Sequence, residues 1–261
     1  DVVARPPAER FANHYLTPLY GLAQIGPELW SANGAAYTVT RLVPDGTGFR
    51  KAAEIAVSAW PAAIVGSPAL PYALVAQRGA DSVGFVDRAR GVLEDALWVG
   101  DEPTGLALSP DSTRLYVSLA TVRQVVVVDV TNRSILDRIS VGFDPRALVL
   151  SADGGRLFVA SYRSANLQNG PTGSRKAEDD QDIWIIDTST RKIEKTVYSV
   201  AADLRALALA PDGSELYVAA SDGDTLPPQN EAGAQPFVHQ ALVVAAAPQA
   251  ADYGQVRRRA D

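Results

Sequence analysis

Residues 103–119 read PTGLALSPDSTRLYVSL, and residues 145–161 read PRALVLSADGGRLFVAS. The second segment begins 42 positions after the first. A third segment, residues 61–77, begins 42 positions before the first and reads PAAIVGSPALPYALVAQ. The same step relates one proline, one serine and one valine in each segment: Pro61, Pro103 and Pro145; Ser67, Ser109 and Ser151; Val75, Val117 and Val159. The chain is therefore built from repeated units of fixed length.

Each unit reads as four short strands. In the unit that begins at Pro145, the apolar run Ala147–Leu150 is typical of a strand buried on both faces, and Ser151–Gly155 is typical of a turn. Residues 156–161 and 183–187 predict the second and third strands, and residues 192–198 alternate as an outer, half-exposed strand does. A period in the low forties made of such strands predicts an all-β fold, a β-propeller of four-stranded blades with 42-residue repeats.

The repeat resembles the YVTN family of β-propeller repeats, relatives of the surface-layer and lactonase-like propellers. The resemblance covers roughly residues 60 to 245 and rests on these segments: Ser109-Pro110-Asp111, Leu115-Tyr116-Val117, Ser151-Ala152-Asp153-Gly154, Leu157-Phe158-Val159, Pro211-Asp212-Gly213 and Leu216-Tyr217-Val218. It implies an extracytoplasmic protein, periplasmic, surface-associated or secreted. Some relatives are fused to haem-containing domains. Seven blades are common in the family, so the roughly five blade-equivalents here indicate either closure with five blades or part of a seven-bladed propeller.

Domain limits follow from where the repeat pattern holds. We expect residues 1–20 to be an N-terminal extension or closing segment, and residues 21–261 to form the propeller, possibly incomplete at the C-terminus. The sequence contains no methionine, which favours a start downstream of the initiation codon and a signal peptide already removed. No apolar run approaches the ~18 residues expected of a transmembrane helix.

The amino-acid composition excludes several kinds of site and partner. The sequence has no cysteine, so it offers no disulfide, no thiolate site and no covalent haem attachment of the C-x-x-C-H kind. Its net charge of −6 argues against nucleic acid as a partner. Only two histidines are present, His14 and His239, so a histidine-rich metal centre is excluded within these residues.

Two insertions interrupt the regular step, at residues 162–182 and 221–240. Both fall between the second and third strands of consecutive units, so they are expected on one face of the propeller. Long loops on a rigid scaffold carry function more often than core strands do. Surface loops without a role are the alternative, because Gly, Pro, Asn and Gln are abundant in both insertions.

A second candidate region lies where the innermost strands begin, at the expected mouth of the central channel. The repeat aligns Trp60, Glu102, Asp144 and Asp203, and two positions later it aligns Ala62, Thr104, Arg146 and Arg205. A ring of aspartate and arginine can bind a small polar or anionic ligand, because arginine offers paired donors. The alternative is that Asp144 with Arg146, and Asp203 with Arg205, pair with each other and stabilise the blades.

Other candidates are weaker in pattern. The run Glu178–Asp182 offers Asp179, Asp180 and Asp182 as ligands for a hard cation such as Ca²⁺, although the spacing of a dedicated calcium loop is missing and solvated charge is the alternative. His239 is a lone ligand or acid/base candidate, or a surface histidine. The aspartates that end the third strands, Asp45, Asp87, Asp129 and Asp187, recur too regularly for catalysis and are interpreted as turn caps.

These observations leave three functional classes. The first is a binding or scaffold module that meets a protein partner, or the remainder of a longer polypeptide, through the face with both insertions. The second is a lactonase-like hydrolase at the channel mouth, using Glu102, Arg146, Arg205 and His239. The third is the propeller portion of a larger haem-containing redox protein. No catalytic serine, phosphate loop or other catalytic motif decides among them.

Overall fold

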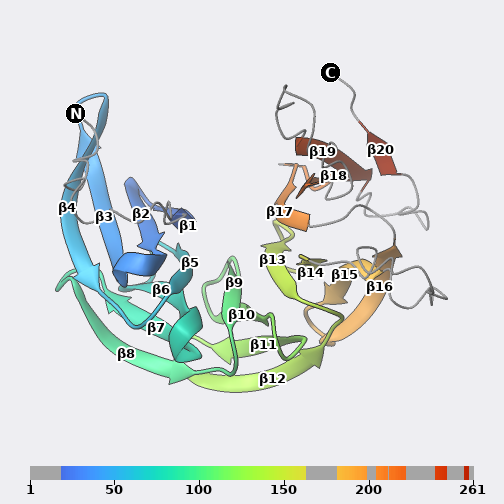
Figure 1. Ribbon diagram of the computed structural model, residues 1–261, viewed down its shortest axis with the longest axis horizontal. Helices are drawn as coiled ribbons and strands as arrows, with labels where there is room; N and C mark the ends of the chain where they lie inside the picture. Colours follow the sequence, from blue (N-terminus) through green and yellow to red (C-terminus); the bar gives the residue numbers. More distant parts are fainter. Residues whose placement is uncertain are drawn as a thin grey trace, which may run out of the picture. The chain divides into compact units, whose positions relative to one another are not determined.

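The computed structural model describes residues 19–162, 181–198, 204–210, 212–221, 239–245 and 256–258. Their strands form five four-stranded sheets, and in every sheet the strands lie side by side in chain order. Figure 1 shows each sheet as four neighbouring arrows of similar colour, because consecutive segments pair with one another. The all-β architecture of four-stranded units predicted from the repeat is confirmed.

The strand bounds follow the 42-residue step from β5 to β14, and the step breaks at β15 and β17. The sheets contain β1 (Leu19–Ile25), β2 (Glu28–Asn33), β3 (Thr38–Asp45) and β4 (Gly48–Ala56); β5 (Pro61–Gly66), β6 (Tyr72–Gln77), β7 (Ser82–Asp87) and β8 (Val92–Trp98); β9 (Pro103–Leu108), β10 (Arg114–Leu119), β11 (Gln124–Asp129) and β12 (Ser134–Ser140); β13 (Pro145–Leu150), β14 (Arg156–Ser161), β15 (Gln181–Asp187) and β16 (Lys192–Tyr198); and β17 (Leu204–Leu209), β18 (Glu215–Ser221), β19 (His239–Ala245) and β20 (Val256–Arg258). Two short 3-10 helices, η2 (Gly34–Ala36) and η3 (Arg78–Ala80), connect strands in the first two sheets. The first strand begins at Leu19, two residues before the expected start of the repeats.

The chain divides into two compact units. One contains Asp1–Val117 with Val128–Leu136, and the other contains Ser118–Val127 with Asp137–Asp261. Residues of the third sheet are thus divided between the units. We call them the first and the second unit.

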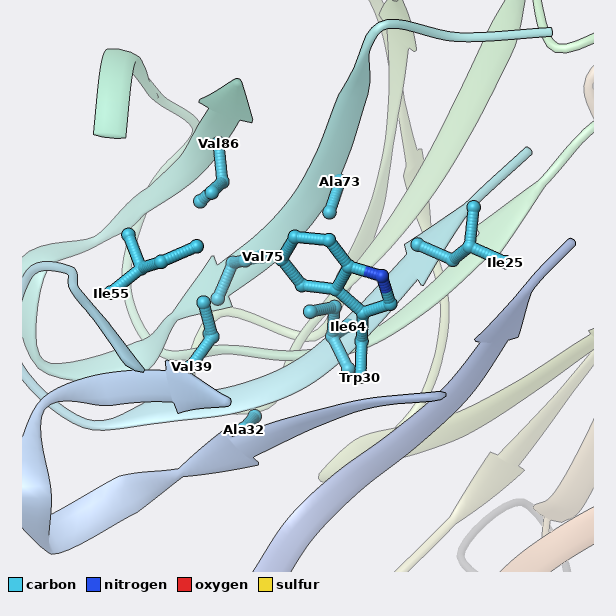
Figure 2. Packing of buried hydrophobic residues seen from close by; sticks show 9 residues of the cluster. All are labelled: Ile25, Trp30, Ala32, Val39, Ile55, Ile64, Ala73, Val75 and Val86. Atoms are coloured by element: carbon cyan, nitrogen blue, oxygen red, sulfur yellow. The ribbon is translucent and has the colours of Figure 1, made fainter. Parts of the chain in front are cut away.

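Each unit has a core made where sheets pack face to face. In the first unit, Trp30 is fully buried among apolar side chains of the first two sheets, including Ile25, Ile64, Ala73 and Val75. Figure 2 shows the Trp30 indole at the centre of this group. In the second unit, Phe158, Ile185, Leu204 and Val218 belong to a cluster from the fourth and fifth sheets. A sheet with two apolar faces must bury both, which explains the stacking of sheets.

Burial within a sheet differs from the expectation for the innermost strand. The first strand of the fourth sheet, β13, is half-buried apart from Pro145, whereas β14 is buried along five of its six residues. The same contrast separates β5 from β6. The first strand is a sheet edge with one hydrogen-bonded neighbour, whereas the second lies between two strands with packed faces above and below. An apolar run therefore does not by itself identify the most buried strand.

Each sheet has two distinct ends because its strands run up and down in order. We call the end that connects the first strand to the second, and the third to the fourth, the turn end. The loop end connects the second strand to the third and the fourth strand to the next sheet. Described loop-end connections are residues 34–37, 57–60, 78–81, 99–102, 120–123 and 141–144.

The turn end is held by its own side chains. The Ser109 hydroxyl donates to Asp111 and accepts from the Arg114 backbone N–H, and Ser151 does the same with Asp153 and Arg156. The serine and aspartate of each S-x-D turn predicted from the sequence thus make the local hydrogen bonds typical of such turns.

Turn capping by the aspartates that end the third strands is confirmed at three positions. The Asp87 carboxylate accepts from the Arg90 N–H at 2.7 Å, and Asp129 and Asp187 accept from Asn132 and Thr190 at 2.9 and 2.7 Å.

Asp45 also ends its third strand, β3, as the repeat predicted. It pairs with Gly48 across a two-residue turn, because β3 is two residues longer than the corresponding β7.

Candidate functional site

The loop end begins from an unusual backbone conformation that recurs with the repeat. Trp60, Glu102 and Asp144 have φ angles of +51°, +53° and +46°, and each directly precedes the proline that starts a sheet. Residues before proline ordinarily take an extended conformation, and positive φ is uncommon for any residue except glycine. The alignment of these three residues is therefore a shared structural position.

A second position with left-handed backbone conformation recurs in the other kind of loop-end connection. Tyr37, Asp81 and Arg123 have φ angles of +54°, +51° and +57° in the connection from the second to the third strand. Their carbonyl oxygens accept hydrogen bonds, each 2.9 Å long, from the N–H groups that follow the outer strands, at Val57, Val99 and Val141. Backbone hydrogen bonds thus join the two kinds of loop-end connection in all three cases.

In the first unit, the loop end presents three exposed aromatic side chains among the described residues, Tyr37, Trp60 and Trp98. Tyr37 and Trp60 are 44% and 43% exposed, and their rings meet edge to face with centroids 6.2 Å apart. The Trp60 carbonyl accepts from the Arg78 N–H at 2.9 Å, and the Arg78 guanidinium forms an ion pair with Glu102 at 2.8 Å. Asp81 accepts from the Glu102 N–H at 3.2 Å. An aromatic pair and an ion pair therefore lie on adjoining connections.

In the second unit, the loop end gathers arginines around aromatic rings. Arg146 forms a two-point ion pair with Asp144, with Nε–Oδ1 at 2.7 Å and Nη2–Oδ2 at 3.2 Å. The Cζ atoms of Arg146 and Arg205 lie 4.1 and 4.8 Å from the centroid of the Tyr162 ring. The Tyr162 N–H donates to the Asp144 carbonyl at 2.9 Å, which fixes the ring beside these arginines.

Arg123 and Phe143 extend this group. The Arg123 Cζ lies 3.4 Å from the centroid of the Phe143 ring, so the guanidinium stacks on the ring face. Phe143 is 45% exposed, and its carbonyl accepts from the Ser161 hydroxyl at 2.7 Å. We refer to Arg123, Phe143, Asp144, Arg146, Tyr162 and Arg205 as the arginine–aromatic cluster.

The turn end of the first unit contains a buried group of ion pairs, although its pairs of Arg133 with Glu94 and Asp95 are exposed. Glu28 is 8% exposed and accepts hydrogen bonds from Trp30 and Arg41, with Arg88 at 3.5 Å. Arg88 also donates to the carbonyl oxygens of Ser67 and Leu70. Burial raises the pKa of Glu28, but the hydrogen bonds and positive charges of the two arginines, with the Trp30 bond, outweigh it and lower the pKa overall.

The sequence-predicted site residues fall into three groups. Trp60 and Glu102 belong to the first unit, whereas Asp144, Arg146 and Arg205 belong to the second and are brought together there. The proposed pairing of Asp144 with Arg146 is present. Asp203, Asp179 and Asp180 lie outside the described residues. Asp182 and His239 are described only as backbone, in β15 and at the start of β19, where His239 pairs with Ser221.

Tyr37, Arg123 and Phe143 were missed as candidates, and Tyr162 was noted only as the edge of an insertion. The signal available for Phe143 was its place next to Asp144, and for Tyr162 its place after the second strand. In the part of the chain that the structure describes, no three histidine, cysteine or acidic side chains gather as metal ligands would. Nor does any described helix have the length and apolar character needed to cross a bilayer.

Comparison with known proteins bears on the fold. No protein-family model and no curated protein matches the chain. A solved structure titled Kuenenia stuttgartiensis Hydrazine Synthase is similar, with a TM-score of 0.74 and 22% sequence identity over 94% of this chain. The present chain spans 66% of that one, just under two thirds of its length. With its five four-stranded sheets, the protein has a β-propeller fold.

Proposed function

We propose that this chain is an extracytoplasmic propeller of the YVTN repeat type that acts as a binding or scaffold module. Its partner is a protein, or the remainder of a longer polypeptide, and the partner surface is the loop end. The repeat type is supported by the S-x-D turns, in which Ser109 with Asp111 and Ser151 with Asp153 make matching hydrogen bonds. The location outside the cytoplasm rests on the resemblance of these motifs to the YVTN family.

One observation carries the choice of surface. Among the described residues, eight large apolar side chains are exposed, and five of them lie at the loop end: Tyr37, Trp60, Trp98, Val122 and Phe143. Exposed aromatic side chains beside arginine are typical of protein interfaces. The connections between β14 and β15 and between β18 and β19, which contain the two insertions, also leave from this end.

The experiment is site-specific photo-crosslinking with benzoylphenylalanine in the producing organism. Replacement of Trp60 or Phe143 should give discrete adducts that contain the same partner when identified by mass spectrometry. Replacement of Val92 or Ile193, which are equally exposed but lie at the turn end, is the matched control. Adducts confined to Val92 and Ile193, or none at Trp60 and Phe143, would reject the loop end as the partner surface.

The larger redox protein remains the second candidate function. It is favoured by the similarity to a longer chain whose title names an enzyme, Hydrazine Synthase, of which this chain spans 66%. At 22% identity that similarity argues for the fold alone, so the activity does not transfer. Reading the gene beyond Asp261 tests this candidate, because haem-attachment sequences there would support it and an immediate stop codon would remove it.

The lactonase-like hydrolase is supported less well. Its arginine candidates each have a partner, with Arg146 on Asp144 and both Arg146 and Arg205 on Tyr162, while Glu102 pairs with Arg78. Substitution of Arg146 and Arg205 by alanine, assayed on a panel of lactones, distinguishes it. Activity in the wild-type chain that disappears in this variant would favour hydrolysis over scaffolding.

A further inference from the structure

Two aromatic residues at the loop end of the first unit have a backbone conformation that bulky side chains rarely adopt. Trp60 and Tyr37 have φ angles of +51° and +54°, in the left-handed region that glycine, asparagine and aspartate tolerate best. In the repeats that follow, Glu102 and Asp144 have this conformation at the position of Trp60, and Asp81 has it at the position of Tyr37. The fold therefore does not require an aromatic residue at either position.

Burial does not compensate for the strained conformation of these two residues. Tyr37 and Trp60 remain 44% and 43% exposed, and their rings contact each other edge to face, with planes at 64°. Among the described residues, neither the Trp60 indole N–H nor the Tyr37 hydroxyl has a hydrogen-bond partner. Strained backbone conformations gather at sites that bind ligands, so the two exposed rings are best explained by binding.

A glycine determines where the Trp60 ring lies. A Cβ at Gly79 would lie 2.9 Å from Cδ1 of Trp60, so the indole packs directly against the backbone of η3. The Trp60 carbonyl accepts a hydrogen bond from the Arg78 N–H at 2.9 Å, which joins the same two connections. Contacts with η3 and with Tyr37 thus restrict the indole before any partner binds, which lowers the entropic cost of binding.

We propose that the ring pair of Tyr37 and Trp60 binds a proline-containing segment of a partner protein in the polyproline II conformation. This rests on the proposed function in placing a protein partner at the loop end. A polyproline II segment has no internal hydrogen bonds, so its carbonyl oxygens can accept from the indole N–H and the phenol O–H while its proline rings pack on the aromatic faces. Such a segment rises about 3.1 Å per residue, so two ring centroids 6.2 Å apart span about two residues.

A carbohydrate also stacks on aromatic rings, but the polar side chains nearby favour the peptide. A sugar needs hydrogen-bond partners for several hydroxyl groups, each of which donates and accepts. On the adjoining connections, Arg78 forms an ion pair with Glu102 at 2.8 Å, and Asp81 accepts from the Glu102 N–H at 3.2 Å. A proline-containing segment needs none of these charged groups, because its amides are neutral and proline has no N–H.

The probe is a fluorescein-labelled decaproline peptide, and its binding to the 261-residue chain is measured by fluorescence anisotropy. Decaproline should bind, whereas a labelled Gly-Ser peptide of the same length should not, because it is flexible and has no proline rings. Trp60→Leu should bind decaproline about tenfold more weakly or worse, since it removes the ring and the N–H donor together. The matched control is Phe49→Leu, which removes an aromatic ring at the turn end of the same unit and should leave the affinity unchanged.

Gly79→Ala is a second variant that keeps both rings, and it also serves if Trp60→Leu does not fold as judged by circular dichroism. The added methyl group would lie 2.9 Å from Cδ1 of Trp60, so the indole must move. Decaproline binding should therefore weaken in Gly79→Ala. Wild-type affinity in this variant would contradict the proposed position of the indole in the site.

Equal weakening by Trp60→Leu and Phe49→Leu would overturn the inference, because binding would then not depend on the ring pair. Displacement of labelled decaproline by cellohexaose at lower concentration than by unlabelled decaproline would replace the peptide by a carbohydrate. A wild-type chain that does not bind decaproline but still forms crosslinks at Phe143 would reject this inference and leave the proposed function standing. Decaproline binding that is lost in Trp60→Leu, in a chain that forms no crosslinks, would keep the ring-pair site and reject the proposed partner surface.

Discussion

The two ends of each sheet use charged side chains for opposite purposes. At the turn end, Asp111, Asp153 and Asp187 accept hydrogen bonds from their own turns, and Glu28 is buried between two arginines. At the loop end, Glu102 and Asp144 pair with arginines that remain part-exposed, and aromatic rings stay open to solvent. The contrast indicates that the turn aspartates and Glu28 stabilise the fold, while this part of the loop end keeps exposed side chains that the fold does not bury.

The largest test of this contrast removes one buried charge at the turn end. Glu28→Gln should lower the free energy of unfolding by about 3 kcal/mol, because Arg41 and Arg88 lose their shared counter-charge in a buried site. Glu102→Gln, its loop-end counterpart in a part-exposed pair with Arg78, should cost no more than about 1 kcal/mol. Urea unfolding of both variants measures the difference, and equal losses would break the comparison.

Two glycines, Gly142 at the loop end and Gly155 at the turn end, test how tightly each end is packed. A Cβ at Gly142 would overlap the ring of Trp184, which is 1% exposed, so Gly142→Ala should destabilise the second unit by about 1–3 kcal/mol. Gly155 at the turn end leaves ordinary contact distances of 3.4 Å and above, and Gly155→Ala should change stability by less than about 0.5 kcal/mol. Thermal unfolding compares them. A larger loss for Gly155→Ala would show that the turn, not the Trp184 contact, limits substitution.

Substitution of Trp60 should change stability less, but it should reduce partner binding. In Trp60→Gly the left-handed φ of +51° becomes free of side-chain strain, while the edge contact with Tyr37 is lost. The two contributions oppose each other, so the free energy of unfolding should move by less than about 1 kcal/mol. Partner adducts from a crosslinker at Tyr37 should nevertheless decrease. A stability loss above about 2 kcal/mol would instead make Trp60 a core residue.

The smallest effect on stability concerns an exposed turn cap. The backbone N–H of Thr190, then the hydroxyls of Ser189 and Thr190, lower the pKa of Asp187 from 3.8 to about 2. Since the folded pKa is depressed, this group stabilises the fold above about pH 4, and the contribution is lost as the pH falls through about 2. Ser189→Ala should raise the pKa toward 3.8, measured by NMR titration of the carboxyl carbon. An unchanged pKa would mean that the bonds from the Thr190 hydroxyl and the backbone hold the carboxylate without Ser189.

Most of the fold could be predicted because it depends on interactions between residues that are close in the sequence. The S-x-D turn and the aspartate cap act within a few residues, so Ser151, Asp153 and Asp187 could be assigned from spacing. Spacing also placed Asp45 correctly at the end of its third strand, but it did not predict that β3 is longer and turns through two residues. Burial of the inner strand was also misjudged, since an apolar run at a sheet edge such as β13 looks the same in sequence as one in the middle.

The candidate site could be predicted only in part. Repeat alignment placed Trp60, Glu102 and Asp144 at one position, and the structure gives them the same backbone conformation. It did not predict Arg123 on Phe143 or Arg205 on Tyr162, because each contact joins segments at least 20 residues apart and depends on how strand ends meet. The pairing of Asp144 with Arg146 was foreseen because they are two positions apart at the start of one strand.

The recurring left-handed positions have a consequence for protein engineering. Tyr37, Asp81 and Arg123 fulfil the same backbone task with an aromatic, an acidic and a basic side chain. The fold thus requires a φ angle and a carbonyl oxygen at all three sites, and at Asp81 the side chain also accepts a hydrogen bond from the Glu102 N–H. A combinatorial library at positions 37 and 123, enriched in asparagine and glycine where the conformation must be eased, would vary what this scaffold recognises while these backbone hydrogen bonds are kept.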